Sequence, residues 1–349
     1  MPPPALRVGV PEPDGDPRAR AAADDAPAEA LRRLAALLAA AGYHFTTVTP
    51  ETHRRVLQRR ADEAASSLRD VFGWNLPFAP GFLPREMNEC LQAAGVLAQN
   101  GSLLRSQVRF ATIDGLVYLH SGYPTTEPDS VFFGPDTYRF AALIQAEAAT
   151  FAAPVERVLD LGCGGGAGGL VAVRALRRAG LAAEGLELTM VDINDRALDY
   201  ARINAATAEQ PRTVFRHADL YGGMTEPAGL IVANPPYLLD PGERLYRHGG
   251  GSFGSALSER IVAEGLRWIA PGGALVLYTG VPIVDGADPF LEAVERVLQG
   301  SGMRFEHREL DPDVFGEELE QPAYARAERI AAIALVVRHA ADDASMQPS

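Results

Sequence analysis

A glycine-rich stretch near the middle of the chain constrains the fold more than any other feature. Residues 157–161 form a largely apolar run typical of a buried strand, and the next residues read Gly162-Cys-Gly-Gly-Gly-Ala-Gly-Gly169. Glycine adopts backbone angles that are barred to other residues and lets a ligand approach the main chain. The stretch therefore predicts a strand that turns sharply into a helix, with a ligand site at the turn.

The C-terminal part alternates between strand-like and helix-like segments. Strands are expected at residues 157–161, 186–193, 213–218, 230–233, 274–279, 304–309 and 330–337. Helices are expected at residues 168–179, 195–206, 256–269 and 289–299. Such alternation predicts a doubly wound α/β fold, in which helices cover both faces of a mainly parallel sheet.

The N-terminal part mixes helices and short strands. Residues 1–26 are rich in Pro, Ala, Asp and Gly and are expected to be loose, and a helix should begin at Pro27. A helix at residues 85–97 precedes a hairpin that turns at Asp114-Gly115, and this order resembles a winged-helix element. The chain should therefore comprise a loose segment, a smaller α+β, winged-helix-like substrate-docking domain and a larger α/β domain, at residues 1–26, 27–130 and 131–349.

The charged residues exclude several mechanisms and partners. The 349 residues include 45 acidic and 32 basic ones, the net charge is −13, and every basic residue is arginine. Without lysine, neither a Schiff base nor a lysine-containing phosphate loop can form. The acidic balance argues against extended duplex DNA as a partner, because DNA binding needs clustered positive charge. The densest basic cluster is either a solvated helix face or a docking patch, and comprises Arg54, Arg55, Arg59 and Arg60.

Other classes are excluded by what the sequence lacks. No apolar run reaches the ~18 residues of a membrane span, and the first residues lack a secretory pattern. Cys90 and Cys163 are too few for a disulfide framework or a four-cysteine zinc site. We expect a soluble cytoplasmic protein with no metal and no membrane partner, and the oligomeric state is open.

Residues around the glycine turn favour S-adenosyl-L-methionine over a dinucleotide as cofactor. Gly162, Gly164 and Gly166 follow Asp160 as Asp-x-Gly-x-Gly-x-Gly, whereas the dinucleotide fingerprint is Gly-x-Gly-x-x-Gly. Alanine is tolerated at the third fingerprint position, here Ala167, so spacing alone leaves the dinucleotide open. Asp160 would repel a pyrophosphate but suits a sulfonium cation and an amino group.

Two more acidic residues extend the expected cofactor site. Asp192 ends the second strand, where it can accept hydrogen bonds from ribose hydroxyls, and Ile193 would lie against adenine. Asp219 follows the third strand and is expected to accept from the adenine amino group. The alternatives are that Asp192 caps the next helix and that Asp219 is an ordinary turn residue.

The segment Asn234-Pro-Pro-Tyr237 follows the fourth strand and suits methylation of a planar nitrogen. Two prolines would hold the asparagine rigidly at the strand tip. The Asn234 side-chain oxygen and the Pro235 carbonyl could accept both N–H bonds of such a nitrogen. Tyr237 would stack on the flat acceptor, and Pro236 would line the same site.

These segments resemble class I S-adenosylmethionine-dependent methyltransferases of the "methyltransferase small" type over residues 131–340. They are most similar to the protein-(glutamine-N5) methyltransferases of peptide release factors, whose relatives include enzymes that methylate bases of ribosomal RNA and DNA. The resemblance implies a seven-stranded sheet with an antiparallel last strand. It also implies that cofactor or substrate is contacted by Asp160, Gly162, Asp192 and Asn234.

The chain departs from those glutamine enzymes in one motif. Gly134-Pro-Asp-Thr-Tyr138 is similar to their Arg-Pro-Asp/Glu-Thr-Glu segment, but Gly134 and Tyr138 replace the arginine and the last glutamate. The first 130 residues do not resemble their helical bundle either. Thr137 would still cap a helix at residues 138–149 and lie near the cofactor.

The long loop after Tyr237 offers further substrate contacts. Arg247 is the main candidate there, alongside Arg244 and Tyr246, and His248 is an open candidate for a general base. The acidic residues 315–320 are expected to form a solvated loop.

The sequence thus predicts an N-methyltransferase that acts on a planar nitrogen. A protein glutamine amide is the favoured acceptor. A nucleobase amine and a small molecule are alternatives, as is a methyltransferase fold that serves only as a binding scaffold.

Overall fold

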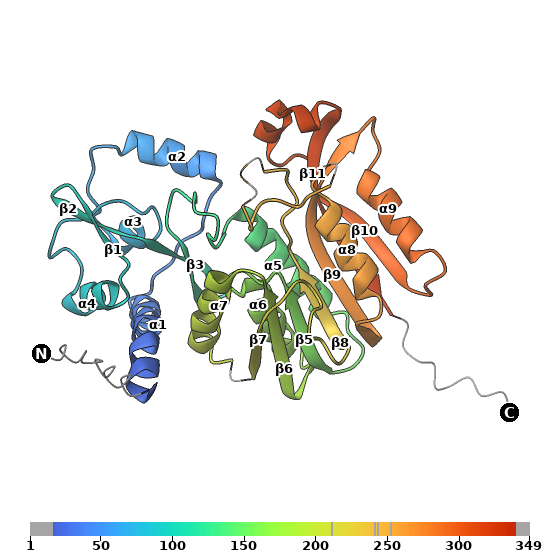
Figure 1. The fold of residues 1–349 in the computed structure, drawn as a ribbon, viewed down its shortest axis with the longest axis horizontal. Coiled ribbons are helices and arrows are strands. Elements are labelled where there is room, and N and C mark those ends of the chain that lie inside the picture. Colours follow the sequence, from blue (N-terminus) through green and yellow to red (C-terminus); the bar gives the residue numbers. More distant parts are fainter. Residues whose placement is uncertain (1–16, 211, 241, 243, 252, 340–349) are drawn as a thin grey trace, which may run out of the picture.

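The computed structural model describes residues 17–339 except 211, 241, 243 and 252, and has a seven-stranded sheet in its C-terminal part (Figure 1). The strand order is β10-β11-β9-β8-β5-β6-β7. β11 runs in the opposite direction to the other six strands of this sheet, as the resemblance implies for the last strand. The strands are β5 (Val155–Leu161), β6 (Ala182–Asp192), β7 (Thr213–His217), β8 (Ala228–Ala233), β9 (Ile269–Val284), β10 (Arg304–Asp311) and β11 (Ala327–Arg338).

Helices cover both faces of the sheet. One face carries α5 (Pro135–Ala148), α6 (Ala167–Arg178) and α7 (Asp195–Thr207), and the other carries α8 (Ala256–Gly265) and α9 (Pro289–Leu298). From Leu230 to Ala233, successive residues of β8 alternate between the two hydrophobic cores, as the period of a strand requires. The doubly wound prediction is confirmed. The helix predicted at residues 256–269 ends early, at Gly265, because Ile269 begins β9 and is buried in the sheet.

The described N-terminal part contains helices and two antiparallel hairpins. Its elements are α1 (Pro17–Ala40), α2 (Pro50–Arg59), α3 (Leu68–Phe72), α4 (Arg85–Ala93), β1 (Leu97–Asn100), β2 (Leu103–Ser106), β3 (Val108–Ile113) and β4 (Leu116–Ser121). The turn predicted at Asp114-Gly115 joins β3 to β4, with both turn residues at positive φ. The winged-helix resemblance of this part stays a prediction.

Two element boundaries in the N-terminal part differ from the prediction. The helix start at Pro27 is wrong, because α1 begins at Pro17 and includes Pro27. Alanine and arginine favour helix in the preceding residues, and a proline removes only one main-chain donor. Of the segment expected to be loose, residues 17–26 are helical and residues 1–16 lie outside the described residues. The helix predicted at residues 85–97 ends at Ala93, because Leu97 begins β1.

The N-terminal part packs against α7, beside the glycine turn. Its core includes Phe110 and Leu119 and also takes in Ile203 of α7. The buried Asn204 side chain accepts from the Leu119 N–H at 2.8 Å and donates to the carbonyls of Leu119 at 3.2 Å and Gly165 at 2.8 Å. One side chain therefore connects the β3–β4 hairpin to the glycine turn.

Two searches of the described residues gave negative results. None of their helices is long and apolar enough to cross a bilayer. Within the same residues, no group of three or more His, Cys, Asp or Glu side chains is placed to hold a metal ion.

Candidate active site

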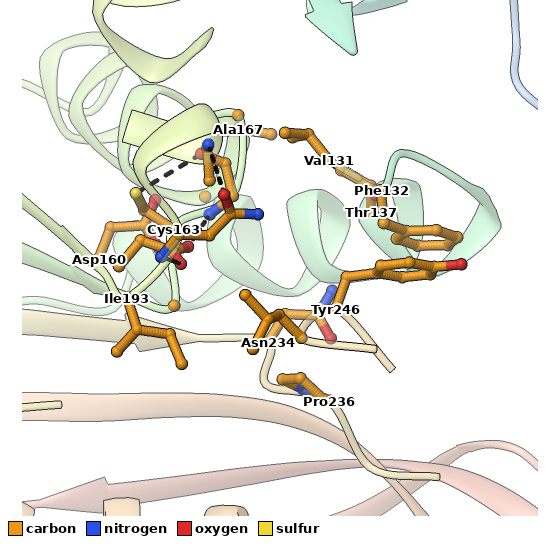
Figure 2. Close-up of a pocket in the computed structure, with 18 of the residues that line it drawn as sticks. Val131, Phe132, Thr137, Asp160, Cys163, Ala167, Ile193, Asn234, Pro236 and Tyr246 are labelled. Carbon is orange, nitrogen blue, oxygen red and sulfur yellow. Dashed lines mark hydrogen bonds between the residues drawn. The ribbon is translucent and has the colours of Figure 1, made fainter. Parts of the chain in front are cut away.

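A cavity of about 170 Å³ lies at the carboxyl ends of β5, β6 and β8, and we call it the glycine-loop cavity (Figure 2). The glycines of its turn have positive φ: +59° at Gly162, +52° at Gly164 and +80° at Gly166. At Gly162 and Gly164 there is room for a side chain, so the backbone angle is what requires glycine. The turn thus exposes main-chain groups to the cavity, as predicted.

Asp160 lies in the wall of this cavity and is almost fully buried. Its Oδ2 accepts a hydrogen bond from the main-chain N–H of Gly169 at 2.7 Å. Burial raises the pKa of the Asp160 carboxyl to about 8, and the nearby Asp192 adds to the rise. A cation in the cavity would favour the charged carboxylate, whereas a pyrophosphate would not.

Asp192 and Ile193 both line the glycine-loop cavity. The Asp192 Oδ2 accepts from Gly164 N–H at 2.8 Å and its Oδ1 from Asn194 N–H at 2.9 Å, which leaves each oxygen able to accept again. Burial raises the pKa of this carboxyl as well. Ile193 is 48% exposed and lines the cavity, so it offers an apolar surface to a ligand. The helix cap proposed as the alternative for Asp192 is made by Asn194.

Asp219 and Thr137 line the same cavity, with two differences from the prediction. The Asp219 carboxylate is 62% exposed and pairs with Arg260 at 2.9 Å. Thr137 is not the cap residue, because α5 begins at Pro135. Instead its Oγ1 accepts from the Gly134 N–H at 3.2 Å, within the first turn of the helix.

A second cavity, of about 280 Å³, adjoins the first, and we call it the interface cavity. Its wall joins the segment Tyr123–Thr126 of the N-terminal part to residues of the C-terminal part. Pro235, Tyr237 and Arg247, which are predicted to act in catalysis or to bind substrate, line it. Four residues line both cavities: Phe132, Asn234, Pro236 and Tyr246. Asn234 therefore lies at the junction, between Ile193 and the ring of Tyr246 in Figure 2.

Tyr237 is held more firmly than the prediction of a stacking ring implies. Its Oη donates to Asp136 Oδ2 at 2.7 Å, and Tyr278 Oη donates to the other oxygen of Asp136 at 2.8 Å. The ring of Tyr237 packs over Gly280 and is only 7% exposed, and burial raises the pKa of its hydroxyl well above its ordinary value. Stacking on an acceptor stays a prediction, for which this ring offers little free area.

Ion pairs fix the loop that follows Asn234-Pro-Pro-Tyr237. Arg244 pairs with Asp240, and Arg247 pairs with Glu318 and lies 3.5 Å from Asp240. The expectation of a solvated loop at residues 315–320 is right for Glu317 and Glu320, which are exposed, and wrong for Glu318, which is 4% exposed. The segment forms η1 (Gly316–Glu320) ahead of η2 (Pro322–Tyr324). The Arg247 partner accounts for this burial, because a buried carboxylate needs a paired cation.

The structure gives His248 and the arginine cluster structural partners. His248 Nδ1 accepts from the main-chain N–H of Asp240 at 3.2 Å, and His248 lies outside the linings of both cavities. In the cluster, Arg54 and Arg55 pair with Glu51 at 2.7 and 2.6 Å. Arg60 pairs with Glu63 and Asp70, both at 2.6 Å.

The sequence reasoning missed Phe132, Phe315 and Asp136 as cavity residues. Asp136 belongs to the segment 134–138 that resembles a motif of the glutamine enzymes, and Phe132 lies just before it. That motif was therefore the signal that could have identified both residues. Phe315 reaches the cavity from the far end of the chain and carried no local signal.

Comparison with known proteins finds similarity in the C-terminal part of the chain. The family model of the methyltransferase small domain matches residues 142–283. A release factor glutamine methyltransferase of Deinococcus radiodurans is 36% identical over 134 residues, which are 35% of this chain and 44% of that protein. One of Mycobacterium leprae is 32% identical over 190 residues, 49% and 61% of the two chains. A ribosomal protein uL3 glutamine methyltransferase of Burkholderia pseudomallei is 32% identical over 147 residues, 36% and 45%.

The matches span about half the length of these relatives. Among solved structures, Trm5b of Pyrococcus abyssi is 16% identical, with a TM-score of 0.45 over 69% of this chain and 62% of that one. The transferase PH0793 of Pyrococcus horikoshii is 15% identical, with a TM-score of 0.45 over 83% and 98%.

Residues 142–283 match the methyltransferase small domain, and the sheet has the fold of a class I methyltransferase. S-adenosyl-L-methionine is the cofactor of this class. The cavity fits it, because a buried carboxylate, a second carboxylate with free acceptor capacity and an exposed isoleucine face the same space.

Proposed function

We propose that this chain is an N-methyltransferase whose acceptor is the side-chain amide of a protein glutamine. The observation that carries the proposal is the place of Asn234 at the junction of the glycine-loop and interface cavities. A group in the interface cavity reaches the glycine-loop cavity past this side chain. Residues 27–130 then serve to present the substrate, since Tyr123–Thr126 line the interface cavity.

Within this proposal, the residues around the cavities divide the work. Asp160, Gly162, Gly164 and Thr137 would hold the methionine part of the cofactor, Asp192 the ribose, and Ile193 and Asp219 the adenine. Gly166 shapes the turn but lies outside the lining of the glycine-loop cavity. When bound, S-adenosylmethionine supplies a methyl group activated by a sulfonium centre.

Asn234 and Pro235 activate the acceptor nitrogen. An amide nitrogen is a poor nucleophile because its lone pair is delocalised. The Asn234 side-chain oxygen and the Pro235 carbonyl accept its two N–H bonds, orient the lone pair and stabilise the positive charge that develops on nitrogen. With the cofactor bound, the nitrogen would gain the methyl carbon as the bond between that carbon and the sulfonium sulfur breaks. The nitrogen would then lose one proton to solvent.

The charges around the interface cavity support an uncharged acceptor. Arg244 and Arg247 are each paired with a carboxylate, and the Asp136 carboxylate is held by two tyrosine hydroxyls and by Arg139 at 3.2 Å. Among the described residues that line the cavity, a neutral amide meets no unpaired charge, whereas a phosphate would find each of these arginines engaged. The glutamine methyltransferases among the relatives point to the same acceptor.

The test uses the full chain with tritiated S-adenosylmethionine. Purified bacterial release factor, ribosomal protein uL3 and protein-free ribosomal RNA are offered separately, and the labelled residue is identified after digestion. We expect label on a glutamine of one protein. Label on RNA alone would favour the nucleobase alternative. A chain that shows no calorimetric binding of the cofactor would instead be a scaffold.

A further inference from the structure

An aromatic pair stands at the junction of the two cavities. The rings of Phe132 and Tyr246 lie 3° from parallel with centroids 6.2 Å apart (Figure 2). Both residues line both cavities, together with Asn234 and Pro236. An acceptor that reaches Asn234 from the interface cavity therefore passes these rings.

Gly134 makes room for the Phe132 ring. A Cβ at residue 134 would lie 2.4 Å from the Phe132 Cζ, which real side chains do not permit. The φ of Gly134 is −160°, an extended angle that any residue adopts, so a side chain here would not strain the backbone but would have to displace the Phe132 ring. The replacement of the arginine seen in similar enzymes by Gly134 thus coincides with an aromatic ring at the junction.

Tyr246 is fixed from several sides. Its Oη donates to the carbonyl of Thr125 at 2.8 Å and accepts from Arg244 Nη1 at 3.2 Å. The Arg244 guanidinium also lies over the ring, 5.6 Å from its centroid. The ring is therefore held in place by the N-terminal part as well as by its own loop.

We propose that Phe132 and Tyr246 form an aromatic slot that selects the acceptor, admitting a flat, uncharged nitrogen group such as a carboxamide to Asn234. The proposal rests on the proposed function and names a determinant that the Asn-Pro-Pro-Tyr motif does not contain. Flat groups gain from contact with aromatic faces. The buried Tyr237 ring leaves this contact to the pair.

The test compares variants of the full chain for release-factor methylation and for cofactor affinity. Phe132→Leu and Tyr246→Leu should each raise the acceptor KM roughly tenfold. The cofactor Kd, measured by calorimetry, should change less than about threefold. Gly134→Ala keeps both rings but displaces Phe132, and it should raise the KM in the same way.

Two matched variants serve as controls. Tyr246→Phe keeps the ring and removes the hydroxyl bonds to Thr125 and Arg244, so its acceptor KM should rise less than that of Tyr246→Leu. Phe82→Leu alters an exposed phenylalanine outside both cavities and should change nothing. If Phe132→Leu does not fold, the acceptor KM of Tyr246→Leu is compared with that of Tyr246→Phe. A higher KM in the leucine variant supports the slot, and equal values contradict it.

Several outcomes would overturn the slot. One is an unchanged acceptor KM in the leucine variants. Another is a fall in kcat and cofactor affinity without a KM change, which marks a purely structural role. If the unmodified chain labels RNA and not protein, the proposed function fails, and the same comparison on RNA still tests the slot. If the unmodified chain neither labels nor binds any of these acceptors, both the proposed function and the slot are contradicted.

Discussion

Asn234 is the residue on which the proposed chemistry depends. Asn234→Ala removes the side-chain oxygen that is proposed to accept a hydrogen bond from the reacting nitrogen, so kcat should fall roughly 100-fold or more. The cofactor Kd should change little, because other residues line most of the glycine-loop cavity. Tritium transfer and calorimetry measure the two quantities. An equal loss of both would contradict the assigned role.

Asp160 should make cofactor binding depend on pH. Its pKa of about 8 leaves the carboxyl largely protonated at neutral pH. A bound cation favours the charged form and releases a proton, so affinity should increase as the pH rises to about 8 and level off above it. Calorimetry in buffers of different ionisation enthalpy counts the protons.

Two comparisons isolate that effect. Asp160→Asn should remove most of the pH dependence. S-adenosylhomocysteine, which lacks the sulfonium charge, should release fewer protons than S-adenosylmethionine does. Binding without any proton release at neutral pH would show that Asp160 is not the responsive group.

Elements defined by local pattern were predictable, and those defined by distant partners were not. The apolar run of β5 and the glycines after it specify a strand and a turn by themselves. The four-residue strands β1 and β2 are too short for a periodic signal. Glu318 is acidic within an acidic segment, and only its partner Arg247, 71 residues away, accounts for its burial.

The joint between the β3–β4 hairpin and α7 offers a test at this scale. Asn204→Ala leaves main-chain groups of Leu119 and Gly165 without their buried partner. The free energy of unfolding should fall by about 2–4 kcal/mol, and cofactor affinity should weaken because the glycine turn loses a support. Urea denaturation and calorimetry measure these effects. Asn88→Ala in α4 is the matched control, and an equal loss there would contradict the role of the joint.

At the scale of the molecule, the glycine-loop cavity was predictable and the interface cavity was not. Asp160, Asp192 and Asn234 end neighbouring parallel strands, so topology alone brings them to one edge. The interface cavity needs Tyr123, Tyr246 and Phe315 to meet from separate parts of the chain. Their meeting depends on how the N-terminal part docks, which no local pattern encodes.

Burial of histidine in the N-terminal part should make stability depend on pH. His53 is 1% exposed, and burial lowers its pKa to about 4. Below the ordinary pKa of about 6.5, His53 binds a proton in the unfolded chain but stays neutral in the folded chain. The free energy of unfolding therefore decreases as the pH falls below this value. Relative to His53→Gln, the unmodified chain should lose about 2 kcal/mol of stability between about pH 7.5 and pH 5.

Urea denaturation at the two pH values measures that difference. If the free energies of unfolding of the unmodified chain and of His53→Gln differ by the same amount at both pH values, His53 is protonated equally in the folded and unfolded states.

The pairs Arg244–Asp240 and Arg247–Glu318 have a consequence for how the protein responds to alkali. The guanidinium of arginine keeps its proton even in strongly basic solution, where the ammonium of a lysine would lose its proton. The wall of the interface cavity should therefore tolerate base and loosen only in acid, as its carboxylates become neutral. Amine-directed reagents, for their part, find no lysine side chain to modify anywhere in the sequence.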